Sequence, residues 1–396
     1  MSKLDELIQK LCPDGVEYRK IGEVTNYEQP SKYIVRNTDY RDEYETPVLT
    51  AGQSFVLGYT NESDGIYPAS KATPVIIFDD FTAAFKWVNF PFKVKSSAMK
   101  MITANESQLL IRFLFHWMGA LNYSSTEHTR LWIGTYSEFK IPVPPLPVQR
   151  EIVRILDNFT ELTAELTAEL TAELTARKQQ YAYYRDKLFD SYSEVDTKKI
   201  GKLTRVFSAS RVHKDEWTNE GVPFFRSSDV VSAFNGGKNT RGKAYISREL
   251  YERLSAKSGK IEKDDILVTG GGTIGIPYII PNDAPIYVKD ADLICIKRNE
   301  HILSKFLYHY FCSTKFRDYL KSITHNATIA HYTITQIENT PVPVFPLKEQ
   351  ARIVSILDSF DTLCTDLSSG LPAEIEARQK QYEYYRDKLL TFTPAD

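Results

Sequence analysis

The chain repeats itself at an offset of 201 residues. The stretch RKQQYAYYRDKLF (177–189) returns as RQKQYEYYRDKLL (378–390), and EIVRILDNF (151–159) returns as RIVSILDSF (352–360). A proline-rich stretch precedes each pair, IPVPPLP in the first copy and TPVPVFP in the second. An internal repeat means that one structural unit is built more than once. The chain is therefore predicted to consist of two tandem halves, each a variable block followed by a proline-rich hinge and a helical block.

The helical blocks carry one apolar residue per helical turn. From Ile152 to Leu174 the apolar positions step by 3, 4, 3, 4, 4 and 4 residues, and the same steps lead from Ile353 to Ile375. A mean period of about 3.67 fits a stripe on an α-helix and disfavours the left-handed supercoil of a heptad repeat. Since Ala, Glu and Leu favour helix, the tract TAELTAELTAEL (163–174) is interpreted as ordered helix rather than as a disordered linker. Its spacer leucines are Leu166, Leu170 and Leu174.

Two apolar helices of matched length in one chain are expected to pair with each other. An antiparallel pair would form a coiled-coil-like scaffold and relate the two variable blocks by a pseudo-twofold axis. The first helix is predicted over roughly residues 148–189, about 60 Å at 1.5 Å per residue. The second contains Gly370 and Pro372, which predict that the helix stops and restarts there.

The variable blocks are predicted to be compact globules of mixed α and β structure, of the α/β (α+β) class. TPVIIFDDF (73–81) and DDILVTGGG (264–272) are apolar runs that end in turn residues, as strands do. LLIRFLFHWM (109–118) and ILSKFLYHYF (302–311) are predicted to be apolar, aromatic-rich helices.

Charge and composition narrow the classes of function. Residues 201–340 carry 20 Lys and Arg against 15 Asp and Glu, whereas residues 22–140 carry 11 against 13. Only the second block has the basic balance expected of a nucleic-acid partner. The four cysteines lie far apart, which indicates a reducing cytoplasm and argues against zinc or disulfides. No metal site is expected. The sequence contains no apolar run of about 18 residues, so no membrane span is predicted.

Two short motifs resemble enzyme signatures. Gly270, Gly272 and Gly275 satisfy the spacing of a dinucleotide-binding loop, but IPYII follows and is predicted to be a strand instead of the required helix. A tight β-turn is the better interpretation. Asp79 and Asp80 could belong to a nuclease metal site, yet a turn after a buried strand is favoured. The stretch NFPF at 89–92 lacks the second proline of an adenine methyltransferase loop and is interpreted as non-catalytic.

The helical blocks ending in QYAYYRDKL and QYEYYRDKL, the proline-rich hinges and the two dissimilar globular blocks resemble the DNA-specificity subunit of a Type I restriction-modification system. The TAEL tract is similar to the spacer repeat of one subgroup of that family. The resemblance covers essentially the whole chain. It implies target-recognition domains at 1–142 and 194–341, each reading one half of a split, asymmetric DNA site. Helical spacers would occupy 143–193 and 342–396.

The resemblance also implies a cytoplasmic, non-catalytic chain without cofactors of its own. Its partners would be double-stranded DNA, two copies of a modification subunit and a restriction subunit, with no membrane. The modification subunits would hold S-adenosylmethionine and methylate adenine, and ATP and Mg would serve the other partner subunits in translocation and cleavage. A pseudo-symmetric scaffold that binds protein only is the alternative. A nucleotide-dependent enzyme built on the glycine turn is a third interpretation.

Polar and cationic loop residues are the predicted DNA contacts. Arg and Asn can read base edges, while Lys and Ser mostly hold phosphate. In the first block these residues are Ser31, Lys32, Lys71, Lys86, Lys95 and Lys100. In the second block they are Arg211, Lys214, Arg226, Lys238, Arg241, Lys243, His325, Asn326, Thr328 and Tyr332. The resemblance adds the turn residues Thr269, Gly271 and Thr273. Each residue taken alone is also compatible with an ordinary surface position.

The repeated tyrosine motifs are the predicted partner-binding sites. Their residues share one helix face and occupy equivalent positions in the two halves, which suits two copies of one partner. The first set is Tyr181, Tyr184 and Arg185, and the second is Tyr382, Tyr385 and Arg386. The alternative is that these residues only join the helix pair to its own domains.

The TAEL tract is predicted to act as a ruler between the recognition domains. One further repeat would add about 6 Å of helix and about 400° of rotation, a net turn of about 40°. That turn is close to the roughly 34–36° between successive base pairs. The length exceeds the rise of about 3.4 Å per pair, so tilt or DNA bending would absorb the difference. A passive spacer without this metric role is the alternative.

Overall fold

The computed structural model describes residues 2–52, 54–123, 129–190, 196–235, 244–290, 292–324, 331–365 and 370–395. The chain divides into two compact units. One comprises residues 1–168 and 376–396, and the other comprises residues 169–375. Each unit therefore combines one variable block with segments of both helical blocks.

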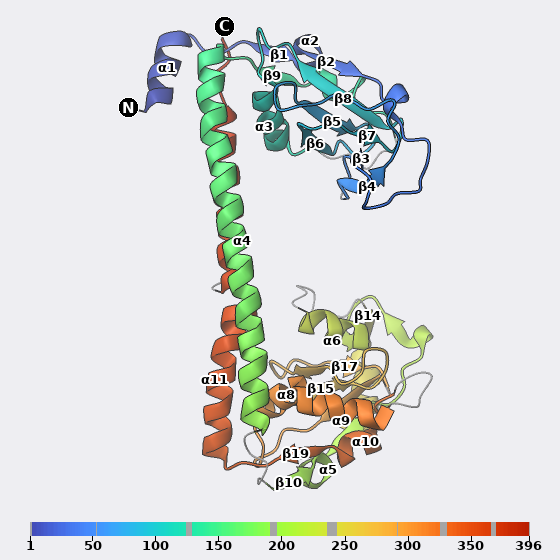
Figure 1. The fold of residues 1–396 in the computed structure, drawn as a ribbon. Helices are drawn as coiled ribbons and strands as arrows, with labels where there is room; N and C mark the ends of the chain where they lie inside the picture. Colours follow the sequence, from blue (N-terminus) through green and yellow to red (C-terminus); the bar gives the residue numbers. More distant parts are fainter. Residues whose placement is uncertain are drawn as a thin grey trace. The chain divides into compact units, whose positions relative to one another are not determined.

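The first unit is built around a four-stranded antiparallel sheet in the order β2-β8-β5-β6 (Figure 1). A three-stranded sheet, β4-β3-β7, and a two-stranded ribbon, β1-β9, accompany it. The strands are β1 (Tyr18–Lys20), β2 (Thr25–Glu28), β3 (Thr46–Leu49), β4 (Val56–Thr60), β5 (Val75–Asp79), β6 (Phe85–Val88), β7 (Lys93–Val94), β8 (Met99–Ala104) and β9 (Lys140–Pro142). The helices are α1 (Lys3–Leu11), α2 (Ile21–Val24), α3 (Ile111–Leu121) and the first part of α4 (Leu146–Asp190).

Strand β5 is central because it is apolar on both faces. Ile76 and Phe78 point into a core shared with α3 and α4, whereas Val75 and Ile77 point into a second core under the three-stranded sheet. Alternate residues of a strand face opposite sides, so one apolar run can serve two cores. Helix α3 thereby joins the sheet to α4 (Figure 1).

The second unit repeats this plan with different sequence. Its four-stranded sheets have the orders β11-β18-β15-β16 and β12-β14-β13-β17, and β10-β19 form the ribbon. The strands are β10 (Thr197–Lys199), β11 (Val206–Ser208), β12 (Trp217–Thr218), β13 (Val222–Phe225), β14 (Ala244–Ile246), β15 (Ile266–Thr269), β16 (Pro277–Ile279), β17 (Tyr287–Val288), β18 (Leu293–Ile296) and β19 (Pro341–Pro343). The helices are α5 (Ile200–Leu203), α6 (Ser227–Phe234), α7 (Arg248–Ser258), α8 (Ser304–Cys312), α9 (Thr314–Thr324), α10 (Ile334–Asn339) and α11 (Leu347–Thr365).

The predicted strands and helices of both globular blocks are confirmed. Residues 75–79 and 266–269 are strands, and α3 and α8 cover the predicted apolar helices. In β15, Ile266 and Val268 enter one core and Leu267 the other, as in β5.

The helical blocks pair antiparallel within each unit. In the first unit Phe159 of α4 contacts Tyr385 of α12 (Leu371–Leu390), and Thr160 bonds Tyr382, so α12 runs backwards along α4. In the second unit Tyr184 of α4 stacks on Phe360 of α11 at 5.8 Å between ring centres. The predicted antiparallel helices are confirmed, and the first spans 45 residues.

The predicted interruption of the second helix is confirmed. Helix α11 ends at Thr365, and α12 begins at Leu371. The carbonyl of Gly370 accepts the N–H of Ala373 at 3.0 Å, and Pro372 occupies the first turn, where no N–H is needed.

The predicted apolar stripe of α4 is wrong at Leu162, whose exposed fraction is 60%. Ile152 and Leu156 are fully buried, and the spacer leucines Leu166 and Leu170 are half-buried. The three-residue step from Phe159 to Leu162 falls about 60° short of a full turn, and it places Leu162 about 80° around the helix from Ile152.

Candidate nucleic-acid interface

The glycine turn after β15 is a hairpin, not a nucleotide loop. Strand β16 follows it and pairs antiparallel with β15, with Val268 opposite Pro277. The hydroxyl of Thr269 donates to the carbonyl of Thr273 at 2.6 Å and accepts the N–H of Ile276 at 2.9 Å. Gly272 adopts a φ of +73°, which favours glycine. The strand predicted after this turn is confirmed, and a helix that would hold a pyrophosphate does not follow it.

Two residues that are predicted to contact DNA are buried and stabilise this turn by hydrogen bonds. Thr269 and Tyr332 are fully buried. The N–H of Tyr332 donates to the carbonyl of Gly270 at 2.9 Å, and its hydroxyl bonds that of Thr340. Both residues are therefore removed from the candidate interface, because neither side chain reaches solvent. Gly271 is also buried, and a Cβ there would lie 3.0 Å from a carboxylate oxygen of Asp292.

The exposed part of the turn faces the start of α6. Gly272 and Thr273 share a hollow of about 410 Å³ with Ser227 and Ser228. Arg226 directly precedes α6, and its side chain pairs with Asp229 at 3.4 Å. Hydroxyls and backbone groups around an open hollow are the groups that contact nucleic-acid backbone.

The other predicted contacts of the second domain fall into two groups. Arg211 and Lys214 are exposed, and no ion pair is found for them within the described ranges. Lys238, Arg241, Lys243, His325, Asn326 and Thr328 lie outside the described residues.

In the first domain Lys100 is not at the surface. Its ammonium nitrogen lies 2.9 Å from a carboxylate oxygen of Asp80 and 3.1 Å from the side-chain oxygen of Gln29. Both members of the ion pair are buried, and Asp80 also accepts the N–H of Trp132 at 2.8 Å. Lys100 is therefore removed from the candidate interface.

The acidic pair at the end of β5 has structural partners. Asp79 accepts hydrogen bonds from the N–H groups of Phe81 and Thr82, so it stabilises the turn that is predicted after this strand. Nowhere in the described ranges do three or more His, Cys, Asp or Glu side chains gather to hold a metal ion.

The remaining predicted DNA contacts of the first domain reach solvent. Ser31, Lys32, Lys71 and Lys95 are exposed, and Lys86 is half-buried. Lys32 pairs with Glu28 at 2.6 Å. Lys71 borders a hollow of about 580 Å³ whose other lining includes Trp87 and Arg112.

Most predicted partner-binding residues contact their own unit. The hydroxyl of Tyr181 is hydrogen-bonded to Nδ1 of His309 at 2.9 Å, Arg185 lies over the Tyr181 ring, and Arg386 lies over the Tyr382 ring. Tyr184 stacks on Phe360 and Tyr385 lies tilted against Phe159, each on the opposite helix, but both tyrosines remain two-fifths exposed. The middle tyrosines of the motif are more exposed, Tyr183 at 60% and Tyr384 at 63%. Periodicity selected the inner face, and the 201-residue offset relates the inner and the outer tyrosines alike, so neither signal singles out the outer pair.

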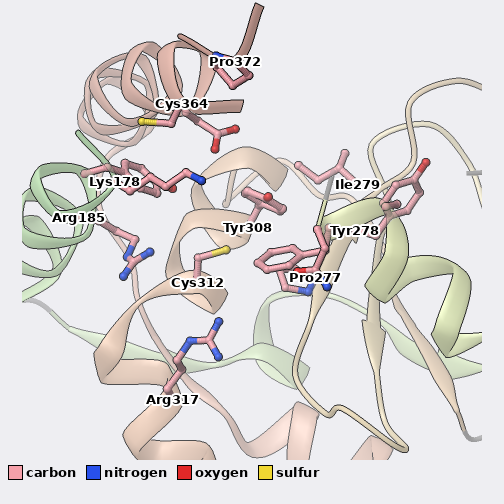
Figure 2. A pocket seen from close by; sticks show the side chains of 15 residues that line it. Lys178, Arg185, Pro277, Tyr278, Ile279, Tyr308, Cys312, Arg317, Cys364 and Pro372 are labelled. Atoms are coloured by element: carbon pink, nitrogen blue, oxygen red, sulfur yellow. The ribbon is translucent and has the colours of Figure 1, made fainter. Parts of the chain in front are cut away.

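A hollow in the second unit lies where α4 and α11 meet the globular domain. It has a volume of about 800 Å³ (Figure 2). Lys178, Arg185 and Arg317 bring positive charge to it, and Cys312 and Cys364 bring thiols. Burial raises the pKa of Cys312 to about 12, so its thiol stays protonated and is a poor nucleophile at neutral pH. The hollow therefore has the features of a binding surface rather than of a thiol active site.

None of the helices in the described part of the chain is both long and apolar enough to cross a membrane.

Comparisons with known proteins agree on one family. The family model described as "Type I restriction modification DNA specificity domain" matches residues 13–176 and again residues 192–377. The chain is 42% identical to the Type I restriction enzyme EcoR124I/EcoR124II specificity subunit of Escherichia coli, across 99% of this chain and 98% of that one. It is 34% identical to a putative type I restriction enzyme specificity subunit of Haemophilus influenzae, across 96% of each.

Solved structures share the fold at low sequence identity. A chain from the structure described as "Structural basis underlying complex assembly and conformational transition of the type I R-M system" superposes with a TM-score of 0.64 at 16% identity, covering 96% of this chain and 98% of that one. The HsdS subunit from Thermoanaerobacter tengcongensis superposes with a TM-score of 0.51 at 17% identity, covering 96% of both chains.

Proposed function

The chain belongs to the Type I restriction-modification DNA specificity family, and on that premise we propose that it selects the DNA sequence on which a Type I restriction-modification complex acts. One observation carries this proposal. The family model matches once in each half, and each match contains one globular domain with the first part of its helical block. Each domain therefore reads one half of a split, asymmetric site, and the helices set the gap between the halves.

The surfaces assigned to DNA are the exposed polar groups of each domain. In the second domain they are the tip of the glycine turn, the start of α6, and the loop that carries Arg211 and Lys214. In the first domain Ser31, Lys32, Lys71, Lys86 and Lys95 are the corresponding residues. Cations hold phosphate and fix register, while side chains at base edges supply selectivity.

The catalytic steps and cofactors are assigned to partner subunits. Two copies of a modification subunit would hold S-adenosylmethionine, and a restriction subunit would use ATP and Mg. The equivalent, exposed Tyr183 and Tyr384 support two equal docking positions on the helices, because tyrosine is enriched where proteins bind each other. A cytoplasmic location follows from action on chromosomal DNA.

The direct test is to express the chain with its modification subunit in a methylation-free host and map N6-methyladenine at single-base resolution. A split motif with a fixed gap is the expected result. An assembled, active complex that leaves no such motif would instead favour a scaffold that binds protein only.

Substituting two loop cations also tests whether the chain is a DNA-specificity subunit or a scaffold that binds protein only. Arg211→Ala combined with Lys214→Ala should lower the salt dependence of DNA binding by the complex by about two units of slope, about 0.9 for each lost phosphate contact. Lys198→Ala with Lys202→Ala removes the same charge from exposed positions outside this loop and serves as the control. Equal slopes for both variants would support the protein-only scaffold.

The docking positions can be counted separately. Tyr183→Ala and Tyr384→Ala should each weaken the binding of one modification subunit, so native mass spectrometry should find complexes with one copy in place of two. Glu165→Ala, an exposed change on the same helix, is the control. Two retained copies in both tyrosine variants would contradict the assignment.

A further inference from the structure

Two buried glutamines attach the helices to the globular domains in the same way. Gln149, near the start of α4, accepts the N–H of Leu110 at 2.8 Å and donates to the carbonyls of Gln108 and Pro144, both at 2.7 Å. It is fully buried. Its side chain therefore joins α4 to the segment that leads into α3 and to the proline-rich hinge.

Gln350 makes the corresponding bonds near the start of α11. It accepts the N–H of Leu303 at 2.8 Å and donates to the carbonyls of His301 and Phe345, at 2.9 Å and 2.8 Å. It too is fully buried. The two glutamines are separated by the repeat offset of 201 residues.

A carboxylate further along each helix makes a second attachment. Asp157 of α4 accepts hydrogen bonds from Arg112 at 2.8 Å and from Nε2 of His116 at 2.7 Å, and both partners lie on α3. Burial alone would raise the pKa of Asp157, but the bonds from His116 and Arg112 outweigh burial and lower it. The carboxylate is therefore charged at neutral pH.

The second half has the same arrangement on α8. Asp358 of α11 bonds Nε2 of His309 at 3.0 Å and pairs with the ammonium of Lys305. Asp157 and Asp358 are again 201 residues apart, although their histidines come from the dissimilar blocks. In this unit Tyr181 of α4 also bonds the other ring nitrogen of His309.

The distance between the two attachments in each half allows them to fix the direction of the domain on its helix. In each half the glutamine and the aspartate are eight residues apart, which is about 12 Å along a helix. A single point fixes where a domain touches a helix, whereas two separated points also fix its direction. The apolar contacts at this junction are non-directional, so these hydrogen bonds supply much of the restraint on angle.

We propose that Asp157 and Asp358 are positioning residues that fix the angle of each recognition domain on its helix and so determine which gap between the half-sites is accepted. This inference rests on the proposed function. A domain free to rotate by the angle of one base pair, about 34–36°, would find its half-site at a neighbouring gap.

The test uses the chain assembled with its modification subunit. Synthetic duplexes would carry the half-sites found by methylation mapping, with the gap lengthened or shortened by one base pair. For Asp157→Ala and Asp358→Ala we expect the preference for the native gap to fall about tenfold, as for loss of a charged hydrogen bond, with unchanged half-site bases. Asp157→Asn retains an acceptor oxygen and should have a smaller effect. Glu161→Ala, exposed on α4, is the control.

The outcomes are distinguishable. If the variants methylate all gaps more slowly while keeping the native preference, the aspartates have a structural role only and the proposal is overturned. The proposal is also overturned if Asp157→Asn folds and behaves as the wild type while the alanine variant does not assemble. If the wild-type complex methylates no split site at all, the proposed function itself fails.

Discussion

The buried ion pair between Lys100 and Asp80 leads to a prediction at the scale of single residues. Replacing Lys100 with Met would leave the buried carboxyl group of Asp80 without its closest cation, and breaking a buried ion pair in this way typically costs about 3–5 kcal/mol. The unfolding transition of the first domain, followed by calorimetry, should therefore move to a lower temperature. Lys95→Met removes an exposed lysine and should change stability by about 0.5 kcal/mol or less. Equal shifts for both variants would show that the pair contributes nothing.

His309 predicts a pH dependence of stability. Burial lowers the pKa of His309 more than its bond to Asp358 raises it, so the folded pKa lies below the ordinary value. Between these two values the unfolded chain binds a proton that the folded chain does not, and stability falls as pH falls below about 6.5. The contribution is fully present above that pH.

The variant His309→Gln isolates this contribution, because glutamine does not titrate. Chemical unfolding at several pH values from neutral down to the mildly acidic range should show a shallower decline for the variant than for the wild type. Identical pH profiles would contradict a lowered pKa at His309.

The sequence did not reveal which of the selected polar residues are buried. Lys100 lies on β8, whose residues Met99 to Ile102 are all buried because the strand is central and covered on both faces. A lysine there has no solvent face to reach, and sequence alternation does not reveal this. Tyr332 and Thr269 were wrongly predicted to contact DNA for a related reason, since their partners, Thr340 and the turn backbone, are set by tertiary packing.

At the scale of elements, the helices were the most predictable part of the molecule. Periodicity placed the first helix at 148–189 against an observed span of Leu146–Asp190, and Gly370 with Pro372 located the restart of the second. The two-point attachments were not predicted, because Gln149 and Asp157 find their partners across about 40 residues of chain in blocks of unrelated sequence.

Deleting one TAEL repeat tests the ruler. Removal of residues 167–170 should shorten the helix by about 6 Å and rotate the remainder of the helix by a net of about 40°, so the gap in the methylated motif should shorten by one base pair. Methylation mapping of the assembled complex measures this directly. Substituting the same four residues with AAEL leaves the length unchanged and should preserve the gap. An unchanged gap after the deletion would favour a passive spacer.

At the scale of the whole molecule, matching ribbons frame the two domains. In the first, Lys20 pairs with Lys140, and in the second Lys199 pairs with Pro341, each ribbon standing between a globular domain and its helical block. The hydrogen bond from Val143 to Glu17 has its counterpart in the bond from Val344 to Asp196. Since these ends are equivalent and the interiors dissimilar, the ribbons are the junctions at which the domains would be exchanged.

An exchange of this kind predicts the symmetry of the recognised site. A chain in which residues 21–139 also replace residues 200–340 would carry the same recognition domain twice. If the antiparallel helices relate the two positions by a twofold axis, the duplicated chain should direct methylation to an inverted repeat of the first half-site. Two domains related by translation would select a direct repeat, which would contradict the pseudo-twofold. The reciprocal chain, with residues 200–340 in both positions, should give an inverted repeat of the other half-site, and the same pair of chimeras thereby assigns each half of the natural site to its domain.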